Sequence, residues 1–166
     1  MKKFVSRYAT PTLLILSLVL VVANNLALLW FFRNFPEPIL DTYLFYTADE
    51  AYAIFEQYGT YYRAMYIRGT LLLDFLYPVF YCLMLSFAIF RVSRHMGWAL
   101  FPLWILPVDY LENATLIYLL IAYPTEYRWL ATGVGFVTCA KWAMVMTSIL
   151  FIVRALWMRY ILKRPF

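Results

Sequence analysis

Residues 106–115 read LPVDYLENAT and lie inside an apolar run long enough to cross a bilayer. An ionisable side chain at bilayer depth costs roughly 2.5–3.5 kcal/mol on insertion scales. Asp109 and Glu112 therefore need partners or a functional role. On a helix they share one face with Asn113, because offsets of three and four residues return to the same side. This stretch is the predicted centre of both the fold and the working site.

The composition around this stretch is that of a membrane protein. Of 166 residues, 65% are hydrophobic and 21% are aromatic, well above the usage of soluble domains. Four apolar segments near spanning length cover about 13–32, 70–90, 98–121 and 129–153. We predict an all-α integral membrane protein, a single four-helix transmembrane domain over residues 1–166, with membrane lipids as its immediate surroundings.

The basic residues indicate topology rather than nucleic-acid binding, although the net charge is +5. Nearly all of them flank the apolar segments. Nine fall on one side of the predicted membrane, namely Lys2, Lys3, Arg7, Arg91, Arg94, Arg154, Arg159, Lys163 and Arg164. Four fall on the other, namely Arg33, Arg63, Arg68 and Arg128. The positive-inside rule then predicts a multi-pass protein with both termini in the cytoplasm and no nucleic-acid partner.

An outer cap is predicted over about 34–68, the only sizeable part outside the bilayer. Thr47 and Glu50 have the spacing of a capping box, and apolar residues follow at helical period until Gly59. We expect a short interfacial helix between the first two spans. Its many tyrosines suit a membrane interface, and a lid over a pocket is the alternative.

Two other spans also carry polar stripes. In the second, Thr70, Asp74, Tyr77 and Tyr81 share one helical face, and Pro78 should bend the helix by freeing the carbonyl of Asp74. In the fourth, Lys141 lies near the midplane, at the depth of Asp109. We expect these two to pair.

Small residues on the fourth span provide a further feature. Gly135, Cys139 and Ala143 recur at intervals of four, which lets another helix approach closely. We predict a possible helix–helix partner there. The two cysteines, Cys82 and Cys139, are read as packing residues because they form no redox motif.

The charges inside the spans do not balance, since one lysine accompanies three carboxyl groups. A proton, a bound cation, a cationic amphipathic or lipid-like ligand, or Arg63 or Arg68 reaching inward would make up the difference. The candidate ligand-binding residues are Asp74, Asp109, Glu112, Asn113, Lys141, Tyr77, Tyr81 and Arg68. No metal site is predicted, although Asp74, Asp109 and Glu112 are weak candidates for one, and no cofactor is indicated.

Two other functions remain open. The buried charges could only fix helix packing in a structural or accessory subunit. Alternatively, paired carboxyl groups could act as acid and base on a lipid or isoprenoid. His95 is the only histidine, so a serine–histidine triad or a multi-histidine zinc site is not expected.

In its number of spans and its buried acids, the chain resembles the emopamil-binding and sigma-2 receptor family. That resemblance implies a four-helix membrane fold with acidic residues in a pocket for sterols or amines. It rests on no specific motif, so it assigns no role to any residue of this chain.

Overall fold

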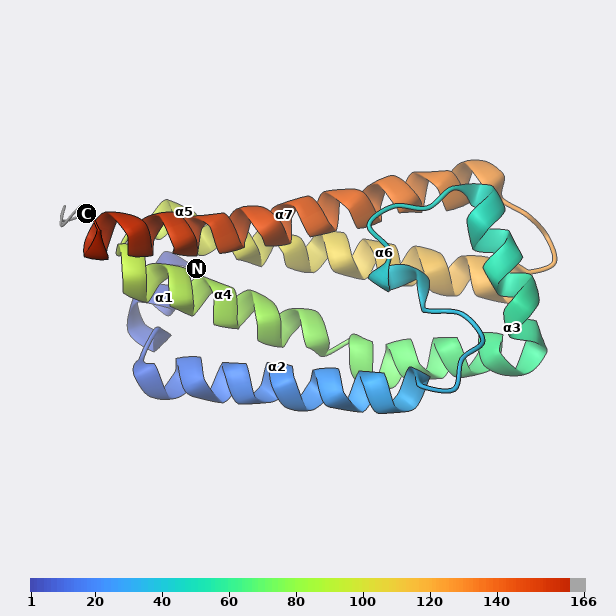
Figure 1. Ribbon diagram of the computed structural model, residues 1–166, viewed down its shortest axis with the longest axis horizontal. Coiled ribbons are helices and arrows are strands. Elements are labelled where there is room, and N and C mark those ends of the chain that lie inside the picture. Colours follow the sequence, from blue (N-terminus) through green and yellow to red (C-terminus); the bar gives the residue numbers. More distant parts are fainter. Residues whose placement is uncertain (162–166) are drawn as a thin grey trace. The chain divides into compact units, whose positions relative to one another are not determined.

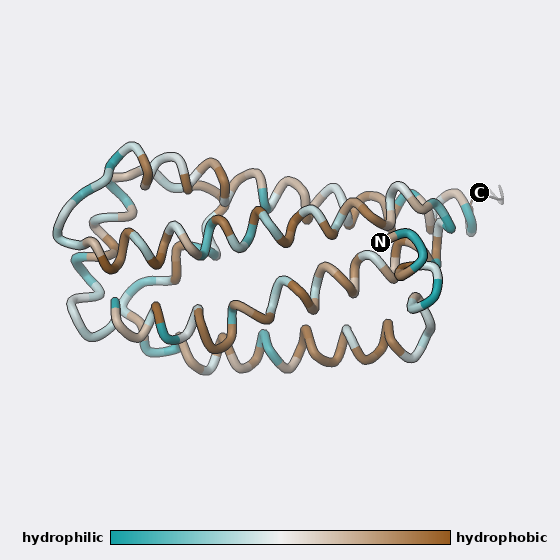
Figure 2. The backbone as a smooth tube through the Cα atoms, turned by 180° about the vertical axis from the view of Figure 1, so that it is seen from behind, coloured by the Kyte–Doolittle hydropathy of each residue, from teal (hydrophilic) through white to brown (hydrophobic). Residues whose placement is uncertain are grey.

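The computed structural model describes residues 1–161, and this part of the chain is helical with no strand (Figure 1). Four stretches are long and apolar enough to cross a membrane: Pro11–Phe32, Ala48–Ser93, Met96–Ala122 and Arg128–Tyr160. Their number equals the number of membrane-spanning segments predicted from the sequence. Figure 2 shows the same pattern, with long helices coloured mostly hydrophobic and connections mostly hydrophilic.

The first span is α2 (Pro11–Phe32), preceded by the short helix α1 (Lys2–Tyr8). Proline is favoured at the first helical position, because its missing N–H would have no intrahelical acceptor there. The outer surface of α2 carries large apolar side chains, and Leu26, Leu29 and Trp30 are each more than 60% exposed. The surface of α2 is therefore rich in exposed apolar side chains.

The predicted cap helix is the first half of α3 (Ala48–Gly69). Its capping box is present: the amide of Glu50 donates to the Thr47 hydroxyl, and the amide of Thr47 donates to the Glu50 carboxylate. Gly59 adopts φ +56° and ψ −176°, a conformation that favours glycine, and breaks the helix as expected. The helix then resumes at once, so the second long helix begins well before the predicted residue 70.

The second span is itself interrupted where the sequence predicted a bend. A π-helical turn, η2 (Thr70–Asp74), follows α3, and α4 (Tyr77–Ser93) begins one residue before Pro78. The amide of Phe75 donates to the carbonyl of Thr70 at 2.8 Å, the five-residue spacing of a π-helix.

The third span consists of three consecutive helices. They are α5 (Met96–Leu100), the 3₁₀ turn η3 (Phe101–Trp104) and α6 (Ile105–Ala122). Pro102 lies at the start of η3, where a regular α-helix is interrupted. The fourth span, α7 (Arg128–Tyr160), continues seven residues past the predicted end at 153, because Arg154 and Arg159 end the apolar run without ending the helix.

The chain divides into two compact units, and all four long helices contribute to both. One unit contains residues 1–23, 77–106 and the chain from 143 onward, and its cores form around Ile89 and Cys82. The other contains residues 24–76 and 107–142. In this second unit the first half of α3 runs across the ends of α6 and α7 (Figure 1).

The core of the second unit includes the connection between α2 and α3, which we call the 33–47 loop. The loop contains the short 3₁₀ turn η1 (Leu40–Thr42). Leu40 and Tyr46 are both fully buried among residues of α3, α6 and α7. The loop is therefore an integral part of the core.

The 33–47 loop packs closely against α7 at Gly135. A Cβ atom added at Gly135 would overlap the backbone carbonyl of Tyr46. The predicted packing face thus meets the protein's own chain at Gly135. A partner helix along Gly135, Cys139 and Ala143 stays a prediction.

Replacing Gly135 by alanine should destabilise the protein by about 1–3 kcal/mol, because the backbone of the loop must move to admit a methyl group. The matched control is Gly133→Ala on the same helix, where a Cβ would meet nothing within 4 Å. That variant should be neutral or up to about 1 kcal/mol more stable, through higher helix propensity. Thermal unfolding in detergent measures both, and equal midpoints for the two variants would contradict the close contact.

Candidate functional site

The candidate site is a set of buried ionisable side chains within the second unit. From α6 come Asp109 and Glu112, from α7 comes Lys141, and from η2 comes Asp74. Glu112 is fully buried and the other three are each 4% exposed. All four positions predicted to lie at membrane depth are therefore interior positions, and none points into water.

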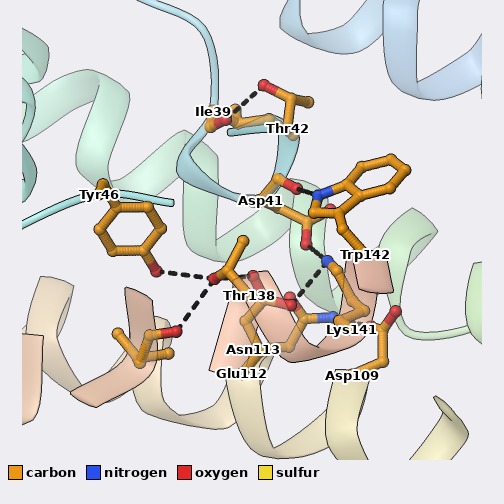
Figure 3. Close-up of polar contacts among 11 residues, drawn as sticks. Ile39, Asp41, Thr42, Tyr46, Asp109, Glu112, Asn113, Thr138, Lys141 and Trp142 are labelled. Atoms are coloured by element: carbon orange, nitrogen blue, oxygen red, sulfur yellow. Dashed lines mark hydrogen bonds and ion pairs between the residues drawn. The ribbon is translucent and has the colours of Figure 1, made fainter. Parts of the chain in front are cut away.

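Lys141 is the positive centre of this group (Figure 3). Its Nζ lies 2.6 Å from Oε2 of Glu112 and also forms an ion pair with Oδ1 of Asp41. Asp41 belongs to η1 in the 33–47 loop, and its side chain is only 18% exposed. The indole nitrogen of Trp142 donates to the backbone carbonyl of Asp41 at 3.3 Å. The ammonium thus joins α6, α7 and the loop.

The second carboxylate oxygen of Glu112 is held by hydroxyl groups. The Thr138 hydroxyl lies 2.5 Å from Oε1 of Glu112 and 3.3 Å from the Tyr46 hydroxyl. Thr138 and Tyr46 are both fully buried. Burial raises the pKa of Tyr46, so its hydroxyl keeps its proton and is able to donate to Thr138.

Asn113 connects the remaining two carboxyl groups. Its Nδ2 donates to Oδ1 of Asp109 at 3.1 Å, and its side chain also hydrogen-bonds Asp74. Its carbonyl oxygen, Oδ1, is buried without a hydrogen-bond partner. Buried polar atoms of folded proteins are nearly always paired, so this acceptor is unusual, as is the buried hydroxyl of Tyr66 in the same unit.

Lys141 has more partners than the sequence predicted. It was expected to pair with Asp109, which does interact with it electrostatically, and it also forms ion pairs with Glu112 and Asp41. Asp41 was missed because it lies in a loop, where no helical period indicates which way a side chain points. The usable signal was its position directly after Ile39 and Leu40, in a connection with many apolar and aromatic residues that favour burial.

The other three candidates are not among the buried residues of the second unit. Tyr77 and Tyr81 belong to the other compact unit, where their rings pack edge to face with centroids 5.3 Å apart. Arg68 is exposed on α3 rather than turned inward. Five of the eight predicted site residues are therefore buried in the second unit, namely Asp74, Asp109, Glu112, Asn113 and Lys141.

Within residues 1–161, no group of three or more His, Cys, Asp or Glu side chains is placed to hold a metal ion. Asp74, Asp109 and Glu112 share a region without converging on one point, and Glu112 is engaged by Lys141 and Thr138. The chemical feature of this site is that several carboxyl groups are buried close to one another.

Comparison with protein-family models, with curated proteins and with solved structures found no match.

Replacing Lys141 by methionine should destabilise the protein by about 3–5 kcal/mol, because Glu112 and Asp41 would lose their shared cation. Adding Glu112→Gln to this variant should recover part of the loss by removing a buried charge. Thermal unfolding of the two single variants and the double variant measures the coupling.

The control for this cycle is the exposed ion pair between Arg128 and Asp49, whose side chains are 54% and 79% exposed. Arg128→Met should cost less than about 1 kcal/mol, as is usual at surfaces. Similar losses for Lys141→Met and Arg128→Met would contradict a central role for Lys141.

Proposed function

We propose that this chain is a small multi-pass membrane protein that binds a cation in its buried acidic cluster. By the acidic cluster we mean Asp41, Asp74, Asp109 and Glu112 together with Lys141. The cation is a proton or the charged head of a small amphipathic ligand. The observation that carries the proposal is four interior carboxyl groups accompanied by one ammonium.

Membrane residence is supported by the distribution of polarity. The long helices expose large apolar side chains on α2 and α7, whereas the acidic cluster lies inside. A protein surrounded by water would show the opposite arrangement. We further propose cytoplasmic termini from the excess of basic residues near both ends; of these, Lys163 and Arg164 lie outside the described residues.

The charge imbalance supports a bound cation in the following way. Lys141 forms ion pairs with Glu112 and Asp41 and also interacts electrostatically with Asp109 and Asp74. One ammonium therefore serves four carboxyl groups, and the amide of Asn113 adds hydrogen bonds but no charge. An excess of buried carboxylates takes up a proton or binds a cation.

A structural role is the second candidate, and one observation favours it. The ion pairs of Lys141 join α6, α7 and the 33–47 loop, which is what a network that fixes helix packing would do. Buried ion pairs of this kind serve specificity in some proteins. The two candidates differ in whether the stability of the protein responds to cations.

The test uses the full chain in nanodiscs of neutral phosphatidylcholine. Sodium, potassium, magnesium and methylammonium are each titrated while the unfolding midpoint is followed. We expect at least one cation, or acidification, to raise the midpoint by several degrees, because a ligand at 100 times its Kd stabilises by about 2.7 kcal/mol. The variant Asp109→Asn should abolish the response and still fold.

The matched control is Asp49→Asn, since the side chain of Asp49 is 79% exposed and outside the cluster. Its response should equal that of the unmodified protein. Protonation is followed separately through the infrared band of protonated carboxyl groups, which should weaken in Asp109→Asn only. A protein that responds to none of these cations and shows no such band would be structural, and the proposal would be wrong.

A further inference from the structure

The acidic residues of the chain all lie in one of its two compact units. The nine Asp and Glu residues fall within 24–76 and 107–142, which form the second unit. The first unit, residues 1–23, 77–106 and the chain from 143 onward, has no Asp or Glu, yet seven of its described residues are Lys or Arg. Every ion pair within residues 1–161 is accordingly in the second unit. The cations of the first unit therefore have no carboxylate of their own unit to neutralise them.

These cations gather around one small apolar core of the first unit. Val5 of α1, Ile89 of α4 and Ala99 of α5 form this core, and Phe151 of α7 packs against it. Figure 1 shows α1, α5 and the last turns of α7 at one end of the unit. Six of the seven basic residues lie within five residues of one of these four core positions. The packing of four helices thus brings cations from separate parts of the sequence to one surface.

The arginine side chains on this surface are held by contacts that leave their charge in place. Arg91 is half-buried, and its guanidinium donates to the backbone carbonyl of Ala9 at 3.2 Å, which joins α4 to the residue after α1. The guanidinium of Arg154 on α7 lies over the ring of Trp98 on α5, 5.2 Å from its centroid. A guanidinium has five N–H donors, so each of these groups keeps donors for an anion. The fold thus orients the cations without neutralising them.

Exposed aromatic rings accompany the cations on the same helices. Phe4 and Tyr8 of α1 are 45% and 39% exposed, and Trp157 of α7 is 54% exposed. The ring of Tyr8 lies 4.8 Å from that of Phe4 and 5.7 Å from the guanidinium carbon of Arg7. Aromatic rings of this kind settle at the interface between membrane and water. Cations beside apolar rings favour a phospholipid, which has a phosphate and hydrocarbon, over a nucleic acid or an acidic peptide.

We infer that this surface of the first unit binds the headgroup phosphates of anionic phospholipids in the leaflet beside it. By the basic surface we mean Lys2, Lys3, Arg7, Arg91, Arg94 and Arg154. Arginine suits this role because its planar guanidinium binds a phosphate through two parallel hydrogen bonds. The exposed rings of α1 and α7 contact the glycerol and the first carbons of the acyl chains. The inference goes beyond the cation site, since it needs the proposed membrane residence but no residue of the acidic cluster.

The test places the full chain in phosphatidylcholine bilayers that contain a trace of spin-labelled lipid. Phosphatidylglycerol and phosphatidylcholine with the same labelled acyl chain differ only in headgroup, and electron paramagnetic resonance gives their relative association with the protein. Each basic residue near an anionic surface strengthens binding by about fivefold, within a Debye length of about 10 Å at 0.1 M salt and about 3 Å at 1 M. We expect phosphatidylglycerol to associate at least about fivefold more strongly at the lower salt concentration and to lose most of this preference at the higher one. Equal association of the two lipids at the lower salt concentration would overturn the inference.

Two double variants with the same change in net charge test where the lipid binds. Arg7→Gln with Arg154→Gln removes two exposed cations of the basic surface. Its control is Arg33→Gln with Arg68→Gln, at two exposed positions of the second unit. The preference for phosphatidylglycerol should fall below about twofold in the first double variant and stay unchanged in the control. Arg7→Lys with Arg154→Lys keeps both charges and should retain most of the preference. Equal losses in the two glutamine variants would overturn the position, because net charge alone would then set the preference.

Soluble competitors distinguish a lipid headgroup from other anions. Glycerol 3-phosphate has the phosphate without acyl chains, and an oligoglutamate peptide has only carboxylates. Neither should displace the labelled phosphatidylglycerol when added in excess, and displacement by either would overturn the assignment to a phospholipid.

The outcomes also separate this inference from the proposed function. Asp109→Asn should leave the preference for phosphatidylglycerol unchanged, because Asp109 belongs to the second unit. Loss of the preference in Asp109→Asn would overturn the assignment to the first unit. A cation response without any lipid preference would overturn this inference alone, whereas a lipid preference without any cation response would overturn only the proposed cation site.

Discussion

The ion pairs of Lys141 with Glu112 and Asp41 are the constraint on which the second unit depends. A charge in an apolar interior is tolerated only when it is paired and hydrogen-bonded. One face of α7 meets this requirement, because Gly135, Thr138 and Lys141 follow one another at intervals of three. Gly135 lets the 33–47 loop approach, Thr138 binds Glu112, and Lys141 binds Asp41 where the loop arrives. The position of the 33–47 loop and the charge pairing of Lys141 therefore depend on each other.

Much of the fold was predictable because hydropathy and local signals act over short distances. The four spans, the capping box at Thr47 and the break at Gly59 follow from residues close together in sequence. The ends of the helices were less predictable. Hydropathy marks where an apolar run stops, whereas a helix continues until something interrupts its hydrogen bonds. Thus α7 continues past Arg154 and Arg159 to Tyr160.

The candidate site was predictable to the extent that it lies on helices. Helical period places Asp109, Glu112 and Asn113 on one face, and the insertion cost of charge requires that face to lie inside. The contact of Lys141 with Asp41 could not be found in this way. Depth along separate helices suggested Asp109 as the partner of Lys141, but its ion pairs with Glu112 and Asp41 depend on helix rotation and on the 33–47 loop. Asp41 enters the site through tertiary packing of Leu40 and Tyr46, which no local pattern encodes.

The acidic cluster has two parts with different chemical character. Around Lys141, the carboxylates of Glu112 and Asp41 have an ammonium, and Thr138 adds a hydroxyl. Around Asn113, the carboxyl groups of Asp109 and Asp74 share a neutral amide whose own acceptor is unpaired. A rigid, ion-paired part holds α6 in place, and a preformed site costs a ligand less ordering. The structural and the ligand-binding roles proposed for these charges are therefore compatible, because the first prepares the geometry that the second requires.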